Sequence, residues 1–187
     1  MNLLKVFFSN SENRDYDLHT LLACRSVSSA CLGYFMAALA WVIFFNVGDG
    51  ISIPALVFKL FFVFVAEITA GYCIASFAGL FLDFKNETVP PAELFILIGS
   101  AGWIKSLLIA GALISAMCPQ AHLFLIAPLF LLIVFILQLV YMTKVVTRCY
   151  NVSTSRTIVA WIFGVIPGSV VFALVGVFFV WGILLLV

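Results

Sequence analysis

The chain has 187 residues, of which 65% are hydrophobic and 9% are charged, and its formal net charge is +1. So few polar side chains cannot cover a water-soluble globule of this length, and the composition therefore predicts a protein of the lipid bilayer. The nine Lys and Arg residues are spread along the chain. Because a surface that binds nucleic acid needs clustered basic residues, we expect no nucleic-acid partner.

Runs of apolar residues long enough to cross a bilayer as helices, about 20 residues each, recur along the chain. They predict an all-α bundle in one transmembrane domain, residues 23–187, which follows a short polar segment at 1–22. The five predicted spans are 23–46, 54–82, 92–117, 121–143 and 157–187. A membrane β-barrel is excluded because its strands alternate polar and apolar residues, whereas these runs are continuous. The lipid bilayer is thus the first expected partner.

The basic residues outside the apolar runs predict the orientation of the bundle. One side of a five-span chain would carry seven of them: Lys5, Arg14, Arg25, Lys85, Lys144, Arg148 and Arg156. The opposite loops, "NVGDGISI" and "CPQ", carry none. The positive-inside rule therefore predicts a cytoplasmic N-terminus and a C-terminus outside. The glycosylation triplets at Asn86 ("NET") and Asn151 ("NVS") would then lie in cytoplasmic loops, and we interpret them as chance matches.

No group of residues has the spacing of a catalytic or metal site. The five Cys residues include no CxxC pair, and the two His residues, His19 and His122, fall on opposite sides of the predicted membrane. The sequence also has no Gly-rich phosphate-binding loop. We therefore expect a protein that is not an enzyme and that binds neither a metal nor a cofactor.

Two charged residues lie deep inside predicted spans. Glu67 comes 20 residues before Glu87, which is at the centre of the loop between spans two and three, and Lys105 comes 18 residues after it. In an antiparallel hairpin the two charges would lie within about 3 Å of the same depth, at 1.5 Å per residue. We therefore predict a buried ion pair between them. It either fixes the register of the two helices or takes part in a proton or ion step.

Small residues at helical spacing predict where helices pack closely. In the second span, positions four residues apart after Glu67 are small: Gly71, Ala75 and Gly79. Such a stripe lets two helix backbones approach each other. In the fifth span, Gly164 and Gly168 have GxxxG spacing, and we expect them to pack within the bundle rather than to form a dimer.

Three stretches give the whole chain a resemblance to a known family. The N-terminal "LLKVFFSNSENRDYDL" is a basic and aromatic lead before the first span. The stretch "CIASFAGLFLDFKNETVPPAELFILIGSAGWIKSLLIAGALI" has a long helix, a short polar loop and a helix that opens with small residues. The stretch "LQLVYMTKVVTRCYNVSTSRTIVAWIFGVIPG" leads from a basic helix end through a Ser-rich step into span five. In this layout the chain resembles the short bacterial form of the Yip1-domain family of five-span membrane proteins.

The resemblance implies five spans, a cytoplasmic N-terminus and a non-enzymatic role in organising membranes or binding partners. Eukaryotic members act in vesicle traffic and contact Rab GTPases through a longer N-terminal region with an acidic-Leu-Tyr-Gly-Pro motif, which "RDYDLHT" lacks. The expected membrane is the bacterial cytoplasmic (inner) membrane, with a Golgi or endoplasmic-reticulum membrane as the alternative. Other membrane proteins, or further copies of the chain, are the expected protein partners. The alternative functions are a small transporter that uses Glu67 and Lys105, and an accessory subunit of a larger membrane complex.

Overall fold

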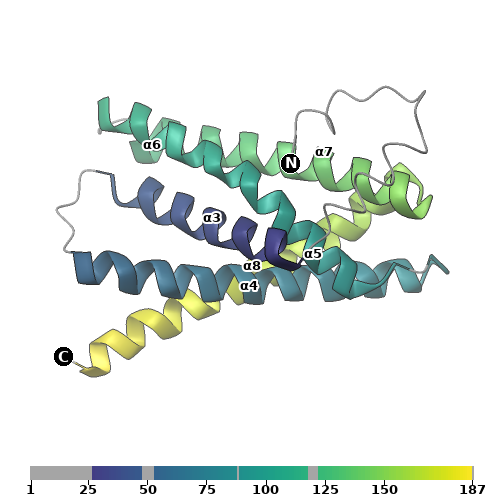
Figure 1. Cartoon of the computed structure of the whole chain (residues 1–187), viewed down its shortest axis with the longest axis horizontal. Coiled ribbons are helices and arrows are strands. Elements are labelled where there is room, and N and C mark those ends of the chain that lie inside the picture. Colours follow the sequence, from purple (N-terminus) through teal and green to yellow (C-terminus); the bar gives the residue numbers. More distant parts are fainter. Residues whose placement is uncertain (1–26, 48–52, 88, 118–121, 187) are drawn as a thin grey trace.

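A computed structural model describes residues 27–47, 53–87, 89–117 and 122–186 of the chain (Figure 1). All regular structure in these ranges is helical, without a strand. Five helical stretches are long and apolar enough to cross a membrane: Val27–Phe45, Ile53–Asp83, Pro91–Met117, Phe124–Tyr150 and Thr154–Phe178. The predicted class, an all-α integral membrane protein with five spans, is confirmed. The predicted N-terminal segment 1–22 lies outside the described residues, and the orientation stays a prediction.

The helices follow the predicted spans in order. The first two spans are α3 (Val27–Phe45) and α4 (Ile53–Asp83), and the third consists of α5 (Pro91–Ala101), η1 (Gly102–Ser106) and α6 (Leu107–Met117). The fourth is η3 (His122–Ile126) with α7 (Ala127–Tyr150), and the fifth is α8 (Thr154–Leu186). The fourth span therefore continues past its predicted end at 143. The prediction measured only the apolar run, whereas a helix can continue beyond the hydrocarbon with basic residues in its last turns.

The apolar run of the third span had indicated a continuous α-helix, but the span is not α-helical throughout. Residues Gly102–Ser106 form a 3₁₀ segment between α5 and α6. A 3₁₀ helix turns 120° per residue rather than 100°, so five such residues rotate the following side chains by about 100° relative to a continuous α-helix. Within α6, Ala112 is buried, at 4% exposure, whereas Ala116, next to the last residue of the helix, is exposed.

The longest two helices, α4 and α8, cross each other, while α3, α6 and α7 lie on one side of α4 (Figure 1). Glycines make the crossing close. A Cβ atom on Gly164 would lie 2.6 Å from the backbone oxygen of Ile74, and one on Gly168 would lie 2.3 Å from Cγ1 of the same residue. The pair with GxxxG spacing in α8 therefore packs inside the bundle, against α4, as its sequence had indicated.

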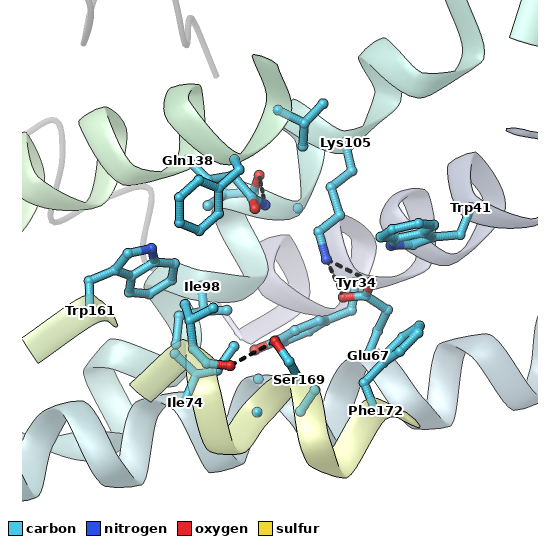
Figure 2. A pocket seen from close by; sticks show the side chains of 18 of the residues that line it. Tyr34, Trp41, Glu67, Ile74, Ile98, Lys105, Gln138, Trp161, Ser169 and Phe172 are labelled. Atoms are coloured by element: carbon cyan, nitrogen blue, oxygen red, sulfur yellow. Dashed lines mark hydrogen bonds and ion pairs between the residues drawn. The ribbon is translucent and has the colours of Figure 1, made fainter. Parts of the chain in front are cut away.

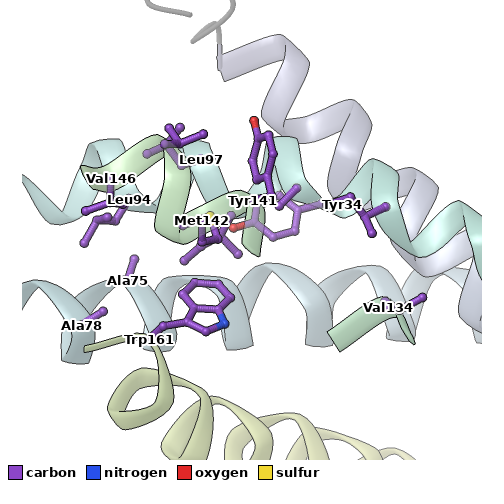
Figure 3. Close-up of a cluster of buried hydrophobic side chains, with 14 of the residues drawn as sticks. Tyr34, Ala75, Ala78, Leu94, Leu97, Val134, Tyr141, Met142, Val146 and Trp161 are labelled. Carbon is purple, nitrogen blue, oxygen red and sulfur yellow. The ribbon is translucent and has the colours of Figure 1, made fainter. Parts of the chain in front are cut away.

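The hydrophobic core runs along the bundle, from Val152 near the α7–α8 connection to Phe44 near the α3–α4 connection. Figure 3 shows part of it, with side chains of α3, α4, α5, α7 and α8 and with Trp161 of α8 next to Met142 of α7. Buried members include Ala75, Ala78, Leu94, Leu97, Tyr141, Met142, Val146 and Trp161. Close packing of aromatic and branched side chains leaves little free volume around Met142 and Trp161.

Polar contacts connect the two loops at the same end of the bundle. Arg156 forms an ion pair with Glu87, and the Tyr150 hydroxyl donates a hydrogen bond to Glu93. Asn86 and Asn151 have φ angles of 59° and 55°. Asn tolerates this left-handed conformation better than most residues other than Gly, which gives both asparagines a structural role at helix ends.

Candidate functional site

The structure brings Glu67 of α4 and Lys105 of η1 into direct contact. Lys105 Nζ donates to Oε1 of Glu67 at 2.6 Å and to Oε2 at 2.7 Å. The Glu67 side chain is 7% exposed and the Lys105 side chain is 18% exposed. Both carboxylate oxygens therefore have a charged donor, and the ammonium has a counter-ion on its own protein. This arrangement lowers the large free-energy cost of placing either charge inside a membrane.

An aromatic side chain of the first span completes the surroundings of the ammonium. Trp41 lies beside Lys105, whose Nζ is 5.8 Å from the centre of the indole ring (Figure 2). The negative potential at the face of an indole attracts a cation at this distance. The charged pair thus involves three spans: α3 supplies Trp41, α4 supplies Glu67, and the third span supplies Lys105.

A tyrosine of α3 connects α4 to the third span near the charged pair. The Tyr34 side chain is 2% exposed, and its hydroxyl donates to the backbone oxygen of Phe95 at 3.0 Å. A Cβ on Gly71 would lie 2.3 Å from the Tyr34 hydroxyl oxygen, so α4 can accommodate the ring only because residue 71 has no side chain. Tyr34 therefore fixes the distance between the helices that carry Glu67 and Lys105.

The stripe of small residues in α4 packs against two different spans. Gly71 contacts Tyr34 of α3, and Gly79 lies against Pro91 at the start of α5, where an added Cβ would be 2.9 Å from the proline ring. Ala75 is 1% exposed within the core. The stripe thus packs against the first span as well as the third. The sequence could not distinguish these neighbours, because the spacing of small residues along one helix does not determine which helices pack against it.

Another close backbone approach lies between α3 and the third span. A Cβ on Gly33 would lie 1.9 Å from the oxygen of Gly99, and one on Gly102 would lie 2.4 Å from the oxygen of Gly33. The signal in the sequence was the run "GSAG" opposite the small residues Ala30 and Gly33. This contact passes directly next to η1, the segment that carries Lys105.

The ion pair borders a cavity of about 390 Å³ that all five spans line. Figure 2 shows the labelled side chains around it, with Trp161 on one side and Trp41 on the other. Most of the other lining residues are apolar. Gln138 of α7 adds a polar group, whose amide donates to the backbone oxygen of Ala101 at 3.5 Å, a long and weak hydrogen bond. A volume in this range suits a small ligand.

A second cavity, of about 570 Å³, lies next to the first, towards the α3–α4 connection. Trp41 and Phe172 line both cavities, and the centres of their rings are 5.9 Å apart. At its other end, Lys59 donates to the side-chain oxygen of Asn46 at 2.5 Å. On the opposite side of the ion pair, the space near Trp161 and Met142 is only about 10 Å³, no more than the volume that one water requires.

The residues of this site that were not identified from the sequence include Trp41, Gln138 and Trp161. They come from the first, fourth and fifth spans. Gln138 did give a signal, because an amide in the run "FILQLV" is costly in lipid unless it faces the interior of the bundle. The two tryptophans gave none, since indole rings also occur at lipid-facing positions near membrane interfaces.

No group of three or more His, Cys, Asp or Glu side chains that could hold a metal ion occurs within the described ranges. Comparisons of the chain with models of protein families, with curated proteins and with solved structures gave no match. The resemblance to the Yip1-domain family is therefore a proposal that depends on the sequence pattern.

Proposed function

We propose that the protein is a non-enzymatic, Yip1-like integral membrane protein that organises the membrane or binds partners within it. The observation that supports this proposal most directly is the contact between Glu67 and Lys105. Each charge satisfies the other at 2.6–2.7 Å, and the packed core lies between them and the end of the bundle that carries the α7–α8 connection. A contact of this kind stabilises a fixed arrangement of helices.

The outer surface supports a role in lipid or partner contact. Large apolar side chains are exposed on every long helix, for example Phe58 of α4, Leu113 of α6, Leu132 of α7 and Val170 of α8. The ion pair Arg156–Glu87 places charged groups at one end of the bundle. Lipid tails and the apolar faces of other membrane helices are the surroundings that such a surface requires. The bacterial cytoplasmic membrane remains the proposed location.

The two adjacent cavities favour a small transporter as the second candidate. They extend from Lys59 and Asn46, near the α3–α4 connection, to the ion pair, with Trp41 and Phe172 between them. Transport would require a second conformation in which the core around Met142 and Trp161 opens. Charged residues near mid-depth are a feature of ion-coupled carriers.

Proton flux in proteoliposomes separates the two candidates. The purified protein is reconstituted with a pH-sensitive dye inside the vesicles, and a potassium gradient with valinomycin supplies the membrane potential. The proposed function predicts the same flux as in vesicles without protein, for wild type and for Glu67→Gln. A flux that requires wild-type protein and disappears in Glu67→Gln would instead establish the transporter.

Photo-crosslinking tests partner binding in native membranes. Benzoylphenylalanine is introduced, one position at a time, at Phe58, Leu113, Leu132 and Val170, which are exposed on four different helices. A partner-binding protein predicts a discrete protein adduct from one face of the bundle and only lipid adducts from the others. Lipid adducts from all four positions would contradict partner binding at these faces.

A further inference from the structure

Two buried indole N–H groups at the 390 Å³ cavity have no hydrogen-bond acceptor among the described residues. These are Nε1 of Trp41 and Nε1 of Trp161. Trp161 is only 6% exposed, and both residues line the cavity, from opposite sides in Figure 2. A buried N–H without an acceptor costs roughly 1–3 kcal/mol, and buried Trp N–H groups usually have a partner. The residues that line the cavity therefore include two donors that the protein itself leaves unsatisfied.

The charges at the cavity indicate that its ligand is uncharged. Glu67 and Lys105 neutralise each other through two hydrogen bonds, and no other charged residue is among the described residues that line the cavity. An anion would have to displace Glu67 from Lys105, and a cation would have to displace Lys105 from Glu67. Either exchange would leave one buried charge unpaired. A neutral acceptor can bind the indoles without disturbing the pair.

The position of exposed lining residues indicates that the ligand enters from the hydrocarbon. Phe135 of α7 is 39% exposed, and Ser169 of α8 is also exposed. These two helices are joined at residues 151–153 and diverge away from that connection (Figure 1). Between them the cavity is accessible from the side of the bundle, at a depth where lipid tails surround the protein. A molecule dissolved in the bilayer can reach it without crossing the core.

We propose that the cavity binds a lipophilic, uncharged molecule with carbonyl oxygens, and that Trp41 and Trp161 are its hydrogen-bond donors. Two classes of membrane molecule have this chemistry: quinones with an apolar tail, and diacylglycerols with their ester carbonyls. This ligand site goes beyond the proposed function and does not rest on it. The two are tested separately, because neither proton flux nor partner adducts measure occupancy of the cavity.

Indole N–H resonances measure the proposed hydrogen bonds directly. Full-length protein with ¹⁵N-labelled tryptophan is studied in dodecyl maltoside micelles, since this detergent has no carbonyl group. The probes are a decyl-substituted benzoquinone and dioctanoylglycerol, and decylbenzene is the matched control without an acceptor. The site predicts a saturable downfield shift of the Trp41 and Trp161 indole protons with at least one carbonyl probe, and the probe that binds identifies the class. Trp103, which is not among the residues that line the cavity, should not shift.

Tryptophan-to-phenylalanine variants keep an aromatic ring and remove the donor. Trp41→Phe and Trp161→Phe should each raise the dissociation constant about fivefold, as expected for one hydrogen bond. The matched control, Trp103→Phe, should bind as wild type does. If Trp161→Phe fails to fold, the wild-type titration and Trp41→Phe decide the question. Equal shifts with decylbenzene, no shift with either carbonyl probe, or unchanged affinity in the variants of the cavity would overturn the proposal.

Discussion

Lys105 Nζ lies 2.6 and 2.7 Å from the two carboxylate oxygens of Glu67, a residue 38 positions earlier in the chain and on another helix. Each side chain alone would be a buried charge in a membrane, and together they form a neutral unit. Since Trp41 adds a third helix to this unit, the relative positions of the first three spans depend on it.

Two lysines, Lys105 and Lys59, should differ sharply in their contribution to stability. Lys105→Met leaves the Glu67 carboxylate without its counter-ion, and we expect the free energy of unfolding to fall by about 3 kcal/mol. Lys59→Met removes only the hydrogen bond to Asn46 near the end of α3, and we expect a loss below about 1 kcal/mol. Reversible unfolding in mixed micelles, followed by circular dichroism, measures both. Equal losses would contradict the assignment of Lys105 as the buried partner.

The crossing between α3 and the third span should not tolerate a single added methyl group. In Gly33→Ala the new Cβ would lie 1.9 Å from the backbone oxygen of Gly99, and backbone atoms can move only if the helices separate. We expect a loss of about 2 kcal/mol in the free energy of unfolding. Gly176→Ala is the matched control, since no heavy atom lies within 4 Å of its added Cβ. It should be neutral or stabilise the helix by up to about 1 kcal/mol.

The glycines of α8 should affect folding rather than association. Gly168 faces Ile74 of α4 within the same bundle, so Gly168→Leu should lower the unfolding midpoint and leave the oligomeric state of the folded protein unchanged. Fluorescence energy transfer between labelled copies in liposomes measures association. If Gly168→Leu abolished energy transfer that wild type shows, while the unfolding midpoint stayed the same, the glycines would instead form an interface between copies.

The turn between α7 and α8 should depend on the left-handed conformation of one asparagine. Asn151 has a φ angle of 55°, which costs an alanine roughly 1–2 kcal/mol and a glycine almost nothing. Asn151→Ala should therefore lower the free energy of unfolding by about 1 kcal/mol, whereas Asn151→Gly should retain the wild-type value. Chemical unfolding of the two variants side by side gives the difference, and equal stability would show that the turn does not constrain this residue.

The number of spans and the depth of the two charges could be predicted because both follow from distances along the chain. Apolar run length counts helices, and a short loop between antiparallel helices places Glu67 and Lys105 at similar depth. The cavity could not be predicted. Its tryptophans come from the first and fifth spans, and the order of spans around the bundle depends on close contacts such as Gly33–Gly99. The 3₁₀ turn at Gly102 also rotates the second half of its span in a way that regular periodicity does not anticipate.

The coupling free energy between Glu67 and Lys105 tests our claim that the two charges form a closed structural contact. It is obtained from the unfolding free energies of wild type, Glu67→Gln, Lys105→Met and the double variant, measured in the same micelles. Either single variant leaves an unpaired buried group, so the double variant should recover stability, with a coupling of about 2 kcal/mol or more. Additive losses, with no coupling, would contradict the claim.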